Sequence, residues 1–114
     1  MTYKVCPAAG LGRDFELIED YLAQAYQGFG EDFDSAAVKA IARIREALDY
    51  MDGFAIHPHR GTEHPQIRFG LRTVTSNRFV YYFEIDEALS EVRILAVFFG
   101  GIDHQQQILG RLRD

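Results

Sequence analysis

Arginines in the second half of the chain carry the side chains best suited to bind an anionic partner. A guanidinium group offers several fixed N–H donors that match a carboxylate or a phosphate. Between residues 60 and 78, four arginines face a single acid, Glu63. A local positive surface is therefore predicted within a chain whose formal net charge is -5. The candidate binding residues, with a nearby tyrosine, are Arg68, Arg72, Arg78, Tyr82 and Arg93.

Some of these residues could also support cleavage of RNA through attack by a 2'-hydroxyl group. That reaction needs a general base, a general acid and cations that stabilise the transition state. Arg72 and Arg78 could supply positive charge, while Tyr82, Glu84 or His104 could move protons. The predicted strands over residues 68–74, 78–85 and 91–99 contain neither lysine nor histidine, so His104 is the imidazole nearest their end. The alternative is that the arginines form ordinary surface ion pairs with acids on neighbouring strands.

Histidines in the loop over residues 54–66 suggest a second kind of chemistry. His57, His59 and His64 are spaced two and five residues apart, and imidazoles on one loop can converge on a metal ion. The loop contains no cysteine, and Glu63 is its single carboxylate. A solvated connector explains the same composition. We expect no metal and no cofactor.

Length and composition limit the class of protein. The chain has 114 residues, which predicts a single domain over residues 1–114. No apolar run approaches the roughly 18 residues of a membrane span, so a cytoplasmic protein is expected. Residues 1–56 hold ten acids and five bases, whereas residues 57–114 hold seven of each. The acidic total disfavours broad binding to nucleic acid, which depends on neutralising phosphates.

Hydrophobic spacing predicts the elements that position these residues. Alternation predicts strands over residues 2–6, 68–74, 78–85 and 91–99. Apolar residues at steps of three and four predict two helices between the first and second of these strands. A glycine-rich turn at residues 28–30 joins the helices, and Asp32 or Asp34 is the predicted N-cap of the second helix. A helical turn follows over residues 103–112. The predicted stripes are Leu11, Phe15, Ile18, Leu22 and Ala25, then Ala37, Ile41, Ile44, Leu48 and Met51. The predicted fold class is α+β, in the order β-α-α-β-β-β, with a helical hairpin packed on an antiparallel sheet and a short C-terminal helix.

Strand alternation also assigns side chains to the two faces of the sheet. If the helices cover the face that carries Phe79, the open face presents Arg68, Arg72, Arg78, Arg93 and Tyr82, unless a bulge shifts the register. Phe98 and Phe99 are adjacent and point to opposite faces, so one belongs to the core. The other is a candidate hydrophobic anchor for a partner, and Phe99 joins the predicted partner-binding set.

The order of elements and several short motifs resemble the RelE/ParE family of type II toxin–antitoxin toxins, some of which are known as plasmid stabilization proteins. The resemblance spans nearly the whole chain and depends on the order and spacing of its motifs. These are YKVCPAAG at residues 3–10, GLR at residues 70–72, NRFVYYFEID at residues 77–86 and VRILAVFFGGID at residues 92–103.

The resemblance implies one of two mechanisms. RelE-like members are mRNA interferases, endoribonucleases that cut transcripts on the ribosome. ParE-like members inhibit DNA gyrase by protein contact. Both are silenced by an antitoxin whose C-terminal segment wraps across the toxin, here expected to be of the ribbon-helix-helix type.

The residues favour the ParE-like branch, in which the chain is a toxin that acts by protein binding and has no enzymatic activity. Family members of this wording often carry a histidine directly after the last apolar run, where this chain has Phe99. The acidic total is also poorly suited to docking on ribosomal RNA. The alternative remains an mRNA interferase that uses Arg72, Arg78, Tyr82 and His104.

Overall fold

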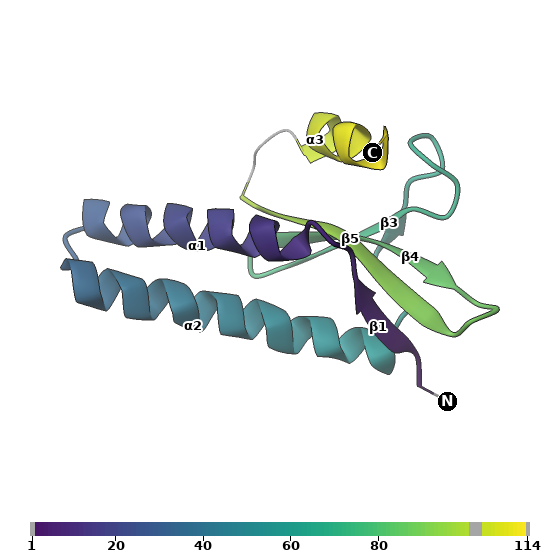
Figure 1. The fold of residues 1–114 in the computed structure, drawn as a ribbon, viewed down its shortest axis with the longest axis horizontal. Helices are drawn as coiled ribbons and strands as arrows, with labels where there is room; N and C mark the ends of the chain where they lie inside the picture. The colour runs from purple at the N-terminus through teal and green to yellow at the C-terminus, as the bar shows by residue number, and fades with distance from the viewer. Residues whose placement is uncertain (1, 101–103, 114) are drawn as a thin grey trace.

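A long helical hairpin lies against one face of a twisted sheet, and a short helix lies against the other face (Figure 1). The computed structural model describes residues 2–100 and 104–113, and the side chains of all of these except residues 104–106. The α+β class and the hairpin packed on the sheet are confirmed. The elements are β1 (Lys4–Pro7), α1 (Leu11–Gly28), α2 (Phe33–Asp52), the 3-10 helix η1 (Gly53–Ala55), β2 (Thr62–Glu63), β3 (Arg72–Ser76), β4 (Phe79–Asp86), β5 (Glu91–Phe99) and α3 (His104–Arg113).

The sheet differs at both edges from the antiparallel sheet predicted from the sequence. Its strand order is β1-β5-β4-β3-β2, and β1 pairs with β5 in parallel, whereas the other pairs are antiparallel. The third strand begins at Arg72 and not at Arg68, because residues 64–70 form turns in which Gly70 has a φ of 87°. Phe69 is consequently exposed, while Leu71 is buried. The predicted start of this strand at residue 68, from which Phe69 and Leu71 would share one face of the sheet, is therefore wrong.

The two helices begin and end near the predicted positions. Asp32 caps α2, since its carboxylate accepts a hydrogen bond from the Ser35 amide at 2.7 Å. The stripe of α1 faces the core as predicted at Leu11, Phe15, Ile18 and Leu22. On α2 the stripe is partly wrong: Ile41 and Leu48 are exposed. The face that packs instead consists of Ala36, Ala40, Ile44, Ala47 and Met51.

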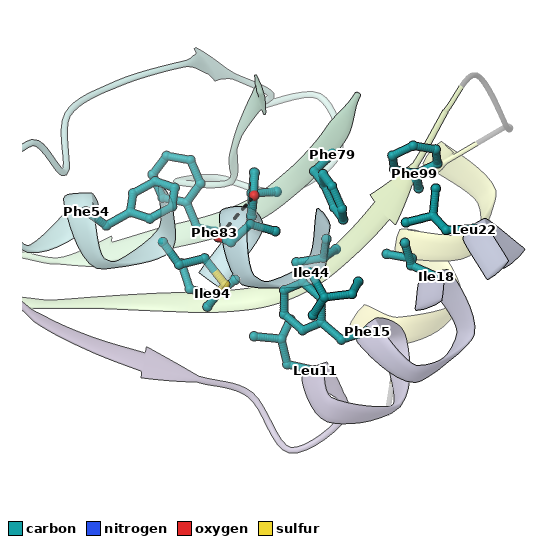
Figure 2. Packing of buried hydrophobic residues seen from close by; sticks show 14 of the residues in the cluster. Leu11, Phe15, Ile18, Leu22, Ile44, Phe54, Phe79, Phe83, Ile94 and Phe99 are labelled. Carbon is teal, nitrogen blue, oxygen red and sulfur yellow. Dashed lines mark hydrogen bonds between the residues drawn. The ribbon is translucent and has the colours of Figure 1, made fainter. Parts of the chain in front are cut away.

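The main core fills the space between the hairpin and the sheet (Figure 2). Aromatic rings from β4 and η1 pack closely there, with the Phe54 and Phe83 ring centroids 4.6 Å apart. The Tyr81 hydroxyl reaches the Ala47 carbonyl oxygen at 3.3 Å, and burial raises the pKa of this phenol, which keeps it neutral. A second, smaller core on the opposite face joins Leu71, Tyr82 and Ala96 to Ile108 of α3.

A β-bulge in β5 determines which side chains enter each core. Tyr82 of β4 pairs with Ala96, but the next residue, Phe83, pairs with Ile94, so Leu95 is an extra residue in β5. Beyond this point the alternation changes phase. Val92 and Ile94 face the hairpin, and so do Val97 and Phe99. Unbroken alternation over residues 91–99 would place Ala96 and Phe98 with Val92 and Ile94; this expectation is wrong, because Ala96 and Phe98 belong to the second core.

Candidate functional site

The structure divides the predicted binding residues between the two faces of the sheet. Arg72 pairs with Phe83, so its side chain lies on the hairpin face. Arg78 also lies toward this face, because its guanidinium carbon is 5.1 Å from the centroid of the Phe99 ring. Arg68 and Arg93 lie on the opposite face. The prediction of one open face presenting all of them is therefore wrong, since β3 starts late and Arg78 lies in a turn.

Tyr82 is not available on an open face. Its side chain is 4 % exposed and belongs to the second core, where Ile108 of α3 is also buried. Its ring meets that of Phe98 edge to face, with centroids 5.6 Å apart. A partner could not contact Tyr82 without moving α3. His104, the other predicted proton-transfer residue, begins α3, and its side chain lies outside the described residues.

The arginines on the α3 face already have acidic partners. Arg68 lies 3.3 Å from Glu84, and Arg93 lies 3.0 Å from Asp86 and 3.9 Å from Glu91. The Arg93–Asp86 pair joins neighbouring strands, as the simpler interpretation of the sequence anticipated, although with a different arginine; Arg68 lies in a turn, and Glu91 is on the same strand as Arg93. Each pair is at least partly exposed, so its contribution to stability is small.

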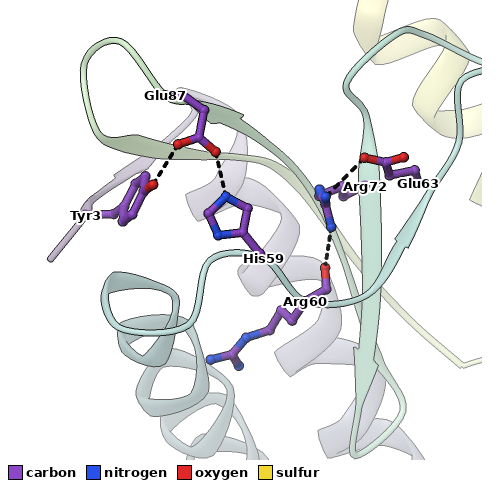
Figure 3. Close-up of polar contacts among 6 residues, drawn as sticks. All are labelled: Tyr3, His59, Arg60, Glu63, Arg72 and Glu87. Carbon is purple, nitrogen blue, oxygen red and sulfur yellow. Dashed lines mark hydrogen bonds and ion pairs between the residues drawn. The ribbon is translucent and has the colours of Figure 1, made fainter. Parts of the chain in front are cut away.

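A polar cluster lies at the end of the hairpin face that is far from Arg78 (Figure 3). It consists of two sets of contacts, one around Glu87 and one around Arg72. Glu87, in the β4–β5 turn, accepts a hydrogen bond from the Tyr3 hydroxyl at 2.6 Å, and its second oxygen lies 2.5 Å from the His59 Nε2 atom. Arg72 contacts Glu63 at 3.0 Å and the Arg60 carbonyl oxygen at 3.3 Å. The cluster therefore ties the loop after η1 to both β1 and the β4–β5 turn.

Hydrogen bonding shifts the titration of this cluster. The bond that Tyr3 donates, together with the His59 contact, lowers the pKa of the Glu87 carboxyl group. The same bond raises the pKa of the Tyr3 phenol. The sequence did not reveal this group, because Tyr3 and Glu87 are 84 residues apart. The sequence suggests His59 as a potential metal ligand, but it does not indicate that His59 contacts a carboxylate.

The histidines of the loop do not converge. His59 contacts Glu87, whereas the His64 Nε2 atom lies 2.7 Å from the Thr73 hydroxyl oxygen. Within the described residues, no group of three or more histidine, cysteine, aspartate or glutamate side chains is placed to hold a metal ion.

An apolar groove lies at the opposite end of the hairpin face, beside Arg78. Two hollows of about 280 and 370 Å³ meet there, and both are lined by Tyr21, Arg78 and Phe99. The smaller continues along Leu17 and Val97, and the larger continues toward the tip of the hairpin. We call these two hollows the Arg78 groove. Its remaining lining residues are Asp14, Ile18, Phe98, Gly100 and Gln107 in the smaller hollow, and Leu22, Ala25, Tyr26, Gly28, Phe29 and Arg43 in the larger.

Phe99 forms part of the floor of this groove and is not a protruding anchor. Its side chain is 7 % exposed and packs against Phe79, with ring centroids 4.9 Å apart. Figure 2 shows it next to Leu22 and Ile18 of α1. Exposed apolar surface comes instead from Leu17 and Tyr21, which are 52 % and 55 % exposed. The sequence did not single out either residue, since they flank the buried stripe of α1.

A buried ion pair supports the wall of the groove and fixes α3. The Asp14 carboxylate accepts hydrogen bonds from the Val97 amide at 3.1 Å and from the Arg111 guanidinium at 2.5 Å. Arg111 also donates to the Leu95 carbonyl oxygen at 2.9 Å. These side chains therefore satisfy two backbone groups of β5 on either side of Ala96, next to the bulge. A Cβ atom at Gly10 would lie 2.9 Å from the Arg111 guanidinium, so glycine leaves room for this contact.

Comparison with solved structures identifies the fold as that of RelE/ParE-type toxins. A chain of the chromosomal ParDE toxin–antitoxin system from P. aeruginosa superposes with a TM-score of 0.67 and 16 % identity, over 87 % of this chain and 97 % of that one. A chain of the toxin–antitoxin complex RelBE2 from Mycobacterium tuberculosis gives a TM-score of 0.59 and 13 % identity, over 87 % and 99 %. At these identities the likeness establishes the fold.

No protein-family model matches the sequence, and no curated protein matches it. Both of these two structures come from toxin–antitoxin systems, one named ParDE and the other RelBE2. Among the described residues, none of the helices combines the length and apolar character needed to cross a membrane.

Proposed function

We propose that this chain is the toxin component of a type II toxin–antitoxin system, that it acts in the cytoplasm by binding DNA gyrase, and that a cognate ribbon-helix-helix antitoxin neutralises it. The observation that carries the proposal is the Arg78 groove. It joins exposed apolar side chains of α1 to a guanidinium group that has no carboxylate within 4 Å in the described part of the chain. Such a surface is suited to protein recognition.

The placement of the predicted catalytic residues supports binding over cleavage. Arg72 and Ser76 are the two ends of β3, and Arg78 lies in the turn beyond Ser76. At the usual rise per residue of a strand, the Cα atoms of Arg72 and Arg78 are therefore more than about 13 Å apart. Tyr82 lies on the opposite face, under α3. The three side chains are thus spread over both ends of β3 and both faces of the sheet, whereas a general acid–base mechanism needs its groups close to one scissile phosphate.

The polar cluster is the observation that favours the second candidate, a RelE-like mRNA interferase. It places an imidazole and a phenol each within hydrogen-bond distance of the Glu87 carboxylate, and the charge of Arg72 helps to lower the pKa of that carboxyl group. His59 or Glu87 could move a proton while Arg72 stabilised negative charge. Arg72, however, is already engaged by Glu63, and the cluster lies on an open surface.

Induced expression of the chain without any antitoxin tests the proposal against this alternative. If gyrase is the target, plasmid DNA recovered after induction will lose negative supercoils, whereas the 5' ends of cellular transcripts will not change. An interferase would give new transcript ends at codon-dependent positions, and His59→Ala and Arg72→Ala would remove them. Normal supercoiling in cells that contain folded protein would contradict the proposal.

A further inference from the structure

Within the part of the chain that the structure describes, Arg78 differs from most other arginines because no carboxylate lies within 4.0 Å of its guanidinium group. Six others lie within 4.0 Å of a carboxylate: Arg13, Arg43, Arg68, Arg72, Arg93 and Arg111. Among the described residues, the side chain of Arg78 contacts the Phe99 ring and no acid. Its position is nevertheless well defined, because its carbonyl oxygen accepts a hydrogen bond from the Gly100 amide at 3.0 Å.

A second positive charge lies near Arg78 and also favours the binding of an anion there. The Arg43 guanidinium carbon lies 5.4 Å from the centroid of the same Phe99 ring. Arg43 also donates to the Asn77 carbonyl oxygen at 2.7 Å, which ties α2 to the turn that carries Arg78. Among the described residues, Glu46 is the one carboxylate within 4.0 Å of Arg43, and it lies at that limit of 4.0 Å. Two like charges against one ring repel each other, and an incoming carboxylate would relieve this repulsion.

The two hollows flank Arg78, because both include it in their lining. Each offers mainly apolar walls: Leu17, Ile18 and Val97 in one, and Leu22, Ala25 and Phe29 in the other. A segment that crosses the groove would therefore meet apolar surface, then the guanidinium group, then apolar surface again. The order of these features defines the chemistry of a complementary segment.

We infer that the Arg78 groove binds a segment of a partner protein that carries a carboxylate between two bulky apolar side chains. The carboxylate pairs with Arg78, and the apolar side chains occupy the two hollows. This inference rests on the proposed function and makes the partner segment part of the antitoxin. It adds the chemical pattern of that segment and the residue that selects it.

Selection of peptides against the intact chain tests the inference without knowledge of the antitoxin. A library of short random peptides is selected on the immobilised protein, and enriched peptides are synthesised for binding measurements by fluorescence anisotropy. We expect them to share an Asp or Glu flanked by large apolar residues. Exchange of that acid for its amide should weaken binding about tenfold, as expected for loss of a charge-assisted pair in a partly exposed site.

Variants of the protein locate the contact. Arg78→Gln should reduce affinity about tenfold for the acidic peptide and little for its amide version. Arg78→Glu should reverse the preference toward a peptide with lysine at the same position. Arg45→Gln, on the exposed outer face of α2, removes an equal charge and should leave affinity unchanged. Circular dichroism and thermal unfolding confirm that each variant is folded.

Failure of this inference is distinguishable from failure of the proposed function. A lack of enriched peptides, or enriched peptides that bind wild type and Arg78→Gln equally, would overturn it, whatever the effect of the chain on gyrase. Enrichment of the predicted pattern would support it even if the chain proved to cleave RNA.

Discussion

Asp14 is the residue whose removal should most clearly disturb the structure. It is the buried charged side chain among the described residues, at 7 % exposure, and it joins α1 to the bulge of β5 and to Arg111 of α3. We expect Asp14→Ala to leave the Val97 amide without an acceptor and the Arg111 guanidinium without its anion. Both losses act on the folded state alone, so the free energy of unfolding should fall.

The expected loss is about 2–4 kcal/mol. Breaking a fully buried ion pair costs about 3–5 kcal/mol, but Arg111 is 30 % exposed, and solvent screening reduces this figure. The unsatisfied amide accounts for about 1–3 kcal/mol of the total. A domain of this size has a total stability of about 5–15 kcal/mol, so the loss is a substantial fraction. Asp14→Asn keeps an acceptor for Val97 and should cost less.

Equilibrium unfolding in urea measures the effect, and a double-mutant cycle with Arg111→Ala isolates the coupling between the two side chains. That coupling should be about 1–3 kcal/mol. Arg13→Ala provides a matched control, because Arg13 and Glu16 form an ion pair on the same helix with side chains 68 % and 69 % exposed. Its removal should change stability by less than about 0.5 kcal/mol.

A loss below about 1 kcal/mol for Asp14→Ala would refute this reasoning, as would a coupling energy near zero. Either result would mean that the hydrogen bonds of Asp14 and Arg111 to the backbone of β5 contribute little to stability. Hydrogen exchange at the Val97 amide supplies a local check, since exchange should accelerate in Asp14→Ala more than at distant amides of β4.

Two further outcomes follow from the geometry. Gly61→Ala should lower the free energy of unfolding by about 2 kcal/mol or more, because the residue has a φ of 79° and a Cβ atom would lie 2.0 Å from the Thr73 carbonyl oxygen; an unchanged thermal midpoint would contradict this. In the folded protein the pKa of Glu87 lies below its ordinary value of 4.5. The hydrogen bonds of Glu87 to Tyr3 and His59 should therefore stabilise the fold at pH values above 4.5, and this stabilisation should be lost as the pH falls through the lowered pKa. An NMR titration of the Glu87 carboxyl carbon measures this pKa directly, and Glu87→Gln should flatten the acid limb of stability against pH; an ordinary titration midpoint would count against the cluster.

Much of the fold could be predicted because single elements are set by local signals. Asp32 and the glycines around residue 30 define the turn of the hairpin, and the predicted strand over residues 91–99 matches β5. The edge strands were harder to predict. The parallel pairing of β1 and the short β2 depend on contacts between segments that are far apart in the sequence.

The bulge at Leu95 could not be predicted from alternation. Residues 94–99 are all apolar, so a shift of one position still places apolar side chains on both faces. On α2, Ile41 and Leu48 share the helical period with the core, but the hairpin packs through small alanines and leaves the larger residues outside. The large residues were therefore a misleading guide to the buried face.

Of the partner-binding residues predicted from the sequence, Arg78 and Phe99 line the candidate groove, whereas the other four lie elsewhere. Arg78 and Phe99 do meet, but at the end of the hairpin face and not on an open sheet. Tyr21 and Leu17, which complete the groove, have helical spacing that is indistinguishable from that of ordinary surface residues. The partners of Asp14 and Glu87 lie 97 and 84 residues away in sequence, beyond the reach of any local pattern.

The most direct test of the central claim is a supercoiling assay with purified DNA gyrase and relaxed plasmid, run beside a translating extract that reports cleavage of mRNA. We predict that the purified chain inhibits supercoiling in proportion to its concentration and that transcripts in the extract stay intact. Full supercoiling activity together with cut transcripts would contradict a toxin that acts by protein binding and would assign the chain to the mRNA interferases.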